Sequence, residues 1–509
     1  MFNIPKSLWH RIRHKGQTKF ETVMKKTIVA MIFMAGALCS CNRNGLDPFN
    51  PFDPFGPDMP MPPGTEGSTY EFKTIEYDGL LATDAIEDIV DKSNTDIYWE
   101  GEAEDDGTFK NTITIEYKGD DVAVEMSKKS VDVYTYEKSG AHVVIRPKDG
   151  VEEVKKCEII LSGGSDNGSL KIYNTTNPDD KEAGKKTKLT LNGVSLKSTI
   201  GPAIDYQSGK RLFLHLADGT ENSLEDATTY SDDIWYWPGK SAADEDRKGC
   251  FFSEKAVIVS GTGLLKVKGN YRHAISVDND FYMRPGATVV VTDAAKNCLH
   301  CNDEIHFTGG YFYCSNTSAG GKIDVMAYDD AINAATTVTF NSGEVYALST
   351  HNDGIDSNGD IYVSGGKITS IAANMEAALD NDNPGQNSTF KITGGEIIGI
   401  GGTVYSPSSS STQYTIVYNG CPVSTIAELA VKDSDGNKIL AITSPQGSQS
   451  SGVLLSSPKF IKDGKYTISI GDTTYQTATL SSIITTIGQQ TGPGGGGGFG
   501  PGGPGGRPM

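Results

Sequence analysis

Apolar residues recur along the middle of the chain in short stretches that are separated by turns containing glycine. Six segments share one order, in which an apolar residue, two or three turn residues and a glycine precede alternating residues: VSGTGLLKV (259–267), MRPGATVVV (283–291), FTGGYFYC (307–314), FNSGEVYAL (340–348), VSGGKITSI (363–371) and ITGGEIIGI (392–400). Their aligned glycines are 23, 24, 33, 23 and 29 residues apart. Strands this short cannot each bury a face alone, so the repeat predicts units that stack on one another.

A second apolar column follows the glycines. Its members are Ile275, Leu299, Ile332, Ile355 and Leu379, with Ile204 as an upstream member. Parallel coils stacked about 4.8 Å apart would bury both columns. The pattern therefore predicts an all-β fold, a parallel β-helix or solenoid. The second and fourth residues after each glycine are expected to point inward: Leu265, Thr288, Phe312, Val345, Ile368 and Ile397, then Val267, Val290, Cys314, Ala347, Ser370 and Gly399.

The flanking segments are expected to cap this solenoid, because an open sheet end needs protection. Strand-like stretches precede it, at 111–117, 131–136 and 142–147, with a short helix expected at 84–91. A hairpin with its turn at Asp435-Gly436 follows it. The expected division is a signal and lipoprotein segment (1–41), a Pro-rich linker (42–68), an N-terminal cap with the first coils (69–184), the β-helix (185–411), a C-terminal β cap (412–487) and a Gly/Pro-rich disordered tail (488–509).

The segment before the linker has the features of an export signal. Met24-Lys25-Lys26 precedes an apolar run, residues 27–38, that is too short to span a bilayer. It ends in Leu38-Cys39-Ser40-Cys41, which resembles the lipobox of bacterial lipoproteins, with Cys41 as the acylated residue. The alternative is a signal cut by an ordinary peptidase. We expect export and lipid anchoring to a bacterial membrane, at the outer membrane or cell surface.

The net charge of the chain limits the classes of molecule that it is expected to bind. The chain carries a formal net charge of −19, and removal of residues 1–40 takes away seven basic residues and one acidic residue, which leaves about −25. Such a charge argues against nucleic-acid binding. It suits a surface that collects divalent cations, or one that only remains soluble. Neither a Ser/His/Asp arrangement nor a phosphate-binding loop is visible.

Residues from about 160 to 405 resemble the cellulose- and polygalacturonate-binding β-helix family, a pectate-lyase-like group of secreted carbohydrate-binding proteins. The matching stretches are LTLNGVSLKSTIGPAI (189–204), LADGTENSLEDA (216–227), FFSEKAVIVSGTGLLKVKGNYRHAIS (251–276) and NDGIDSNGDIYVSGGKIT (352–369). The resemblance covers roughly half of the chain. It implies a right-handed parallel β-helix, bound calcium and binding of a plant-type polysaccharide, without established catalysis.

An acidic group recurs one coil apart. Asp330 and Asp353 are separated by 23 residues, so stacking places them on adjacent coils, about 4.8 Å apart. Two such carboxylates repel unless one is protonated or a cation lies between them. Asp356 adds a further oxygen donor, and calcium prefers oxygen ligands. The resemblance to a pectate-lyase family with a D-G-I-D calcium turn points to these residues and to Asp329. Alternatively, the aspartates only stabilise turns, which is the role expected of Asp360, Asn358 and Asp380.

Two other clusters offer metal-ligating atoms. Asp278 lies one coil before Asp303, and the two could hold a second cation. Cys298 and Cys301, with His306, carry soft ligands, but they fall on the turn of the Leu299 column, so a local disulfide or free thiols are favoured over zinc.

The longest insertion, residues 228–249, contains Trp235, Tyr236 and Trp237 in an acidic context. Exposed aromatic rings can stack on sugar rings, so these three are candidate carbohydrate-binding residues. The alternative is that they fold back over the side of the β-helix.

These patterns lead to three hypotheses of function. The first is a calcium-containing carbohydrate-binding lipoprotein that recognises a plant-type or acidic polysaccharide such as polygalacturonate or cellulose. The second is a calcium-dependent polysaccharide lyase, which needs a base near the calcium; Lys367 and Lys391 lie on following coils, but solvated surface lysines are the simpler interpretation. The third is a structural or adhesive surface protein.

Overall fold

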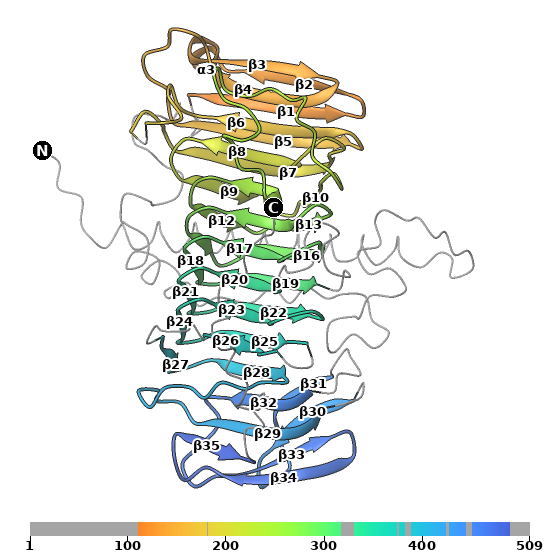
Figure 1. Ribbon diagram of the computed structural model, residues 1–509, viewed down its shortest axis with the longest axis vertical. Coiled ribbons are helices and arrows are strands. Elements are labelled where there is room, and N and C mark those ends of the chain that lie inside the picture. Colours follow the sequence, from red (N-terminus) through yellow and green to blue (C-terminus); the bar gives the residue numbers. More distant parts are fainter. Residues whose placement is uncertain are drawn as a thin grey trace, which may run out of the picture. The chain divides into compact units, whose positions relative to one another are not determined.

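The computed structural model describes residues 110–180, 182–316, 330–373, 376–381, 388–423, 427–443 and 450–488. All of them belong to one compact unit, Met59–Met509. Cys41, Asp329, the helix expected at 84–91, the linker and nearly all of the tail lie outside these ranges. The described chain is all-β and mostly parallel, with sheets of 21, 10 and 4 strands and a single short helix, α3 (Lys128–Val133) (Figure 1). No helix in these ranges combines the length and the hydropathy needed to cross a membrane.

The ten-stranded sheet is built by pairing strands that are far apart in the sequence. From β8 onward each strand pairs in parallel with the third strand after it, and only β3 and β4 pair antiparallel. The order is β3 (Tyr134–Ser139), β4 (Ala141–Pro147), β6 (Gly168–Tyr173), β8 (Ile204–Ser208), β11 (Gly249–Ser253), β14 (His273–Val277), β17 (Leu299–Cys301), β20 (Ile332–Ala334), β23 (Ile355–Ser357) and β26 (Leu379–Asp380).

Two further parallel ladders in the largest sheet follow the same step of three strands. One contains β9 (Leu212–Leu216), β12 (Val257–Gly261), β15 (Phe281–Met283), β18 (Glu304–Phe307), β21 (Thr337–Phe340), β24 (Asp360–Val363) and β27 (Phe390–Ile392). The other contains β10 (Glu221–Glu225), β13 (Leu264–Gly269), β16 (Thr288–Ala294), β19 (Tyr311–Asn316), β22 (Glu344–Ser349), β25 (Lys367–Ile371) and β28 (Glu396–Gly401).

The apolar columns lie where the repeat predicts, apart from one slip. Ile204, Phe251, Ile275, Leu299, Ile332, Ile355 and Leu379 pair in register and are buried. In β16, however, Val289 and Val291 occupy the inward positions that were expected for Thr288 and Val290. Ala287 adds one residue after the turn glycine, and a shift of one residue in a strand moves every side chain to the other face.

The turn glycines permit the close stacking of successive turns. Gly310 and Gly343 have φ values of +77° and +87°, a region that L side chains rarely adopt. A Cβ atom on Gly343 would lie 2.5 Å from the Gly310 carbonyl oxygen. Glycine is therefore required at these turns for two reasons: the backbone has a positive φ, and a Cβ atom would not fit.

The N-terminal part of the described chain contains β1 (Thr112–Lys118), β2 (Asp121–Met126), β5 (Cys157–Ser165) and β7 (Thr187–Lys197). Strand β1 pairs antiparallel with β2 but parallel with β5. The strand expected at 131–136 is only partly correct, because residues 131–133 end α3. Ser127 caps this helix, and its side chain accepts a hydrogen bond from the Ser130 N–H.

The C-terminal part departs from the coil period. Strands β29 (Thr415–Val423), β32 (Ser450–Ser456) and β35 (Ile484–Ile487) continue the large sheet. A separate antiparallel sheet contains β31 (Lys438–Thr443), β30 (Glu428–Lys432), β33 (Lys465–Ile470) and β34 (Thr473–Thr479). The β30–β31 hairpin confirms the predicted turn, at which Gly436 has a φ of +85°. This sheet belongs to a hydrophobic cluster that also contains residues of β13, β16, β19, β22, β25 and β28.

Candidate functional site

One column of residues on the ten-stranded sheet faces away from the main core. Its members alternate with core residues along each strand and pair in register from strand to strand: Lys171, Asp205, Phe252, Ser276, His300, Asn333, Asp356 and Asp380. The two ends of this column differ. One end leads to the insertion 228–249, and the other end leads to the acidic group around Asp330.

Hydrogen bonds connect Asp330 with Asp356 through Asn333, and with Asp353, whose backbone N–H donates to Asp330 Oδ1 at 3.3 Å. Asn333 Nδ2 donates to Asp356 Oδ2 at 2.6 Å and to Asp330 Oδ2 at 3.2 Å. Asn352 Nδ2 donates to Asp330 Oδ1 at 2.7 Å, and the backbone N–H of residue 377 donates to Asp353 Oδ1 at 2.6 Å. Asp330 is only 1% exposed and Asp353 only 7%. These carboxylates are thus held within the protein and are not free in a surface loop.

Burial and mutual repulsion raise the pKa of all three carboxyl groups. The pKa of Asp330 is raised well above its ordinary value by burial and then by the charges of Asp356 and Asp353. Burial raises the pKa of Asp353 to about 8. Burial and then the charge of Asp380 raise the pKa of Asp356 to about 7. The energy of ionising this group is therefore high unless a positive charge compensates it.

Asp380 belongs to the same group, although sequence reasoning assigned it to a turn only. It pairs with Asp356 in the β23–β26 register, one coil further on. Its charge raises the pKa of both Asp353 and Asp356. The sequence did contain a signal for this role. Asp380 directly follows Leu379, and the residue after each member of the Leu379 column faces outward.

The predicted second acidic group is arranged differently. Asp278 lies with Asp246 and Glu254, and one oxygen of each carboxylate falls within 4.8 Å of the others. Lys248 Nζ lies 2.5 Å from Asp246 Oδ2 and 3.1 Å from Asp278 Oδ2. The positive charge of Lys248 therefore already compensates two of these three carboxylates.

Asp303 is not part of that carboxylate group. Its Oδ1 accepts a hydrogen bond from Thr336 Oγ1 at 3.2 Å, while Asp278 Oδ1 accepts one from Asn302 Nδ2 at 2.7 Å. Cys298 and Cys301 are buried free thiols, and the Cys301 thiol donates to the backbone oxygen of Asn279. Burial raises the pKa of Cys301 to about 12, so its thiol is poorly suited to ligate a metal.

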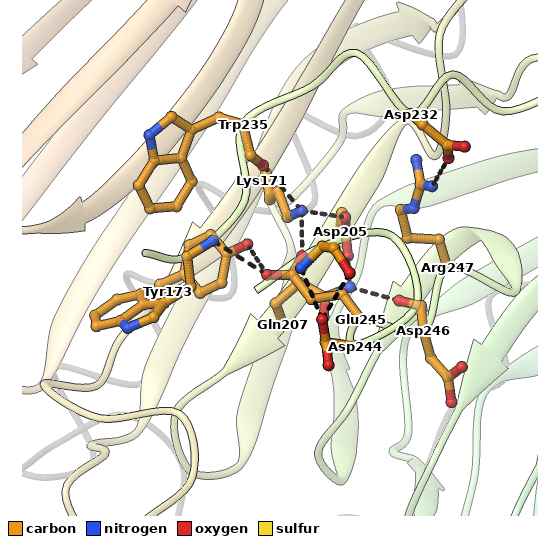
Figure 2. A network of polar contacts seen from close by, with 12 residues as sticks. Lys171, Tyr173, Asp205, Gln207, Asp232, Trp235, Asp244, Glu245, Asp246 and Arg247 are labelled. Atoms are coloured by element: carbon orange, nitrogen blue, oxygen red, sulfur yellow. Dashed lines mark hydrogen bonds and ion pairs between the residues drawn. The ribbon is translucent and has the colours of Figure 1, made fainter. Parts of the chain in front are cut away.

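The insertion 228–249 folds against β6 and β8 through a buried polar network (Figure 2). Lys171 Nζ donates to Glu245 Oε2 at 2.5 Å and lies 3.7 Å from Asp205 Oδ2. Tyr173 donates from its hydroxyl to Glu245 Oε1 at 2.6 Å, and Gln207 Nε2 donates to Asp205 Oδ1, also at 2.6 Å. Lys171, Asp205 and Glu245 are 6%, 3% and 8% exposed. One buried ammonium group thus faces two buried carboxylates.

The three aromatic residues of the insertion have different surroundings. The Trp235 ring packs edge-on against Tyr173 at 5.2 Å, with the Arg146 guanidinium 5.3 Å from its centre. Lys171 and Arg247 lie 4.7 and 5.7 Å from the centre of the Tyr236 ring. Trp237 packs on Tyr173 at 5.4 Å. All three rings are half-buried, so the insertion folds back onto the sheet while leaving part of each ring exposed.

A pocket of about 560 Å³ opens between this insertion and the outer face of β4 and β6. Trp235 lines it, whereas Tyr236 and Trp237 do not. Its remaining polar lining includes Lys171 and Asp205, and also His142, whose pKa is lowered by burial. The pocket therefore combines one aromatic wall with buried hydrogen-bond donors and acceptors, which is the usual composition of a small-molecule site.

Comparison with known proteins assigns the family. A family model described as carbohydrate-binding domain-containing protein matches residues 154–476, which is more than half of the chain. The chain belongs to this family. A carbohydrate-binding domain-containing protein of Acetivibrio thermocellus is 28% identical over 173 residues, which are 31% of this chain and 58% of that relative. The chain therefore matches little more than half of the relative's length.

A solved structure, of a polysaccharide lyase-like protein from C. thermocellum as a gadolinium derivative, is also similar to this member of the carbohydrate-binding domain-containing family. The similarity covers 56% of this chain and 93% of the other, with 17% identity and a TM-score of 0.32. A likeness this weak carries no argument about fold or function.

Proposed function

We propose that this protein binds a plant-type or acidic polysaccharide, such as cellulose or polygalacturonate, on a right-handed parallel β-helix that holds calcium. Three parallel ladders in which each strand pairs with the third strand after it support the β-helix. Family membership supports the class of ligand. Export and lipid anchoring at Cys41 belong to the same proposal and rest on the lipobox-like LCSC segment.

The pocket beside Trp235 is the observation that carries the carbohydrate proposal. Aromatic rings provide a large apolar face for a sugar ring, with little conformational entropy to lose. Lys171 donates and Asp205 accepts, so the floor can hydrogen-bond the hydroxyl groups of that sugar. Both side chains are already held by partners within the protein, Lys171 by Glu245 and Asp205 by Gln207, so the polar groups that face a sugar are oriented before it binds.

The carboxylates of Asp330, Asp353 and Asp356 are the type of donor that a hard cation prefers, although among the described residues only Asp246, Glu254 and Asp278 bring one oxygen of each of three carboxylates within 4.8 Å of one another. All the charged ligands are carboxylates, and calcium takes six to eight oxygen ligands. Hydrogen bonds reach Asp353 Oδ1 and Asp356 Oδ2, so the other oxygen of each carboxylate could ligate a cation. A bound calcium would offset the repulsion among carboxylates that are already buried. We therefore assign calcium to this group and not to Asp278, which Lys248 already contacts.

A binding panel tests the proposed function. We expect the wild-type protein to bind cello-oligosaccharides, oligogalacturonates or both, measured by isothermal titration calorimetry in calcium-containing buffer. Repeating the titrations in EGTA shows whether calcium contributes to the affinity or only to the fold. Absence of binding across the panel, with calcium present and the protein folded, would contradict the proposal and favour a structural or adhesive role.

The pocket affinity should depend on pH through Asp205. Burial raises the pKa of this carboxyl group to about 6, partly offset by Lys171, Gln207 and Arg247, while Glu245 raises it further. The ionised carboxylate accepts stronger hydrogen bonds than the protonated carboxyl group, so affinity should rise between pH 5 and 7, whereas Asp205→Asn should flatten the profile. Because the folded pKa is raised, ionisation of Asp205 also lowers the stability of the fold as the pH passes through 6. An unchanged profile in the variant would exclude Asp205 as the titrating group.

Lyase chemistry lacks a supporting observation. Lys367 is exposed, pairs with Glu344 at 2.7 Å and lies on β25, while Lys391 lies on β27. Both strands belong to ladders other than the one carrying Asp356 and Asp380. Neither candidate base therefore shares a face with the proposed calcium site.

A further inference from the structure

The buried ion pair of Lys171 and Glu245 forms hydrogen bonds with the backbone of the insertion at two positions. Lys171 Nζ donates to the carbonyl oxygen of Trp235 at 3.2 Å. Glu245 Oε1 accepts a hydrogen bond from the backbone N–H of Trp237 at 3.3 Å and from the Tyr173 hydroxyl at 2.6 Å. The same ion pair thus holds the insertion at residues 235 and 237, which flank Tyr236.

Contacts with aromatic rings link the positions of Trp235 and Trp237 to the Lys171–Glu245 ion pair. Tyr173 lies against both Trp235 and Trp237, at 5.2 and 5.4 Å, and its hydroxyl is fixed by Glu245. Lys171 also lies 4.7 Å from the Tyr236 ring. Removing the Glu245 charge would leave Lys171 paired with the more distant Asp205 carboxylate, at 3.7 Å.

The Glu245 carboxylate itself does not line the pocket, whereas Trp235, Lys171 and Asp205 do. A group that is buried behind a binding surface and holds the residues on that surface acts through them. We propose that Glu245 is a positioning residue for carbohydrate binding: with Lys171 it fixes the insertion so that the Trp235 ring forms the pocket wall. This inference rests on the proposed function, because it needs a carbohydrate that contacts Trp235.

The energetics of buried ion pairs favour a positioning role over a stabilising one. Desolvation of two buried charges largely offsets their attraction, so the intact pair contributes little net stability, whereas removing one partner leaves the other charge buried and destabilises the fold. The insertion has a second attachment, where the Tyr230 hydroxyl donates to Asp226 at 2.6 Å and Tyr230 stacks on Tyr271. The loop is therefore expected to stay attached to the coil when the Glu245 charge is removed.

A double-mutant cycle on carbohydrate affinity tests the proposal. The variants are Glu245→Gln, Trp235→Ala and the double variant, titrated with whichever oligosaccharide of the panel binds the wild-type protein. We expect Glu245→Gln to weaken binding about tenfold in the wild-type background and to have no further effect once Trp235 is alanine. Equal losses in both backgrounds would show that Glu245 acts independently of Trp235 and would overturn the proposal.

A milder variant keeps the test decisive if Glu245→Gln does not fold. Tyr173→Phe removes only the hydroxyl that donates to Glu245, and it should give the same non-additivity with Trp235→Ala at smaller amplitude. Binding that is lost in Trp235→Ala but unaffected by both Glu245→Gln and Tyr173→Phe would refute the positioning role while leaving the carbohydrate site intact. Binding that Trp235→Ala does not change would instead refute the proposed site.

Discussion

Replacing Trp235 with alanine is expected to weaken carbohydrate binding by about 2 kcal/mol, roughly thirtyfold in Kd. The ring forms a wall of the pocket, and truncating it removes the apolar face while leaving Lys171 and Asp205 on the floor. Isothermal titration calorimetry with the oligosaccharide that binds the wild-type protein measures the change. The thermal unfolding temperature should change little by comparison, because the ring is only half-buried.

Trp237→Ala is the matched control for Trp235→Ala. It removes the same type of side chain from the same insertion, and Trp237 packs on the same tyrosine, Tyr173. Because Trp237 does not line the pocket, its loss should weaken binding much less than the loss of Trp235. Equal losses in the two variants would mean that the glycan lies across the outer face of the insertion and not in the pocket.

Calcium is expected to raise the thermal stability of the wild-type protein, and Asp353→Asn should abolish most of this gain. A ligand at a hundredfold excess over its Kd stabilises the folded state by about 2.7 kcal/mol. The asparagine Oδ1 can still accept the hydrogen bond from the backbone N–H of residue 377, so the change removes mainly the charge. Differential scanning calorimetry in calcium and in EGTA, at one fixed pH, measures both effects.

The behaviour in EGTA separates a cation site from a turn role. Without calcium, Asp353→Asn should be at least as stable as the wild-type protein, because it relieves repulsion among buried carboxylates. Asp360→Asn is the control, since Asp360 Oδ1 accepts from the Thr389 N–H and Oδ2 from the Tyr362 hydroxyl. Its stability should respond to calcium as the wild-type protein does. An equal loss of stability for Asp353→Asn in calcium and in EGTA would favour the turn interpretation.

Much of the fold could be predicted from the sequence because its signal is local and repeats. The members of the Ile355 column follow their glycines by 12 or 13 residues, except where an insertion intervenes before Ile332, and the structure confirms that they pair in register. Two local features were missed: the helix α3, which contains the first half of the strand expected at 131–136, and the position of one strand within its turn. Thr288 was expected to face inward where Val289 does, because the number of residues between glycine and strand is not constant.

The candidate sites were less predictable. The spacing of one repeat correctly indicated that Asp330 and Asp353 lie close together. Asp380, however, was assigned to a turn, because only the register across two successive strand pairs shows which aspartates share a face. The aromatic insertion was recognised, yet its three rings could not be told apart. Their roles depend on Lys171 and Glu245, which are 74 residues apart in the sequence.

The sequence by itself determined the all-β class, the repeat, the apolar column and the insertion that carries the tryptophans. These features depend on alternation and spacing, which a strand and its turns impose within one coil. Only the tertiary structure decided that Trp235 lines a pocket, that Lys248 contacts Asp278 and that Glu245 holds the insertion. Each of these depends on which side chains meet across coils and loops. Such contacts are set by packing and charge compensation between distant segments, which do not produce a repeating pattern in the sequence.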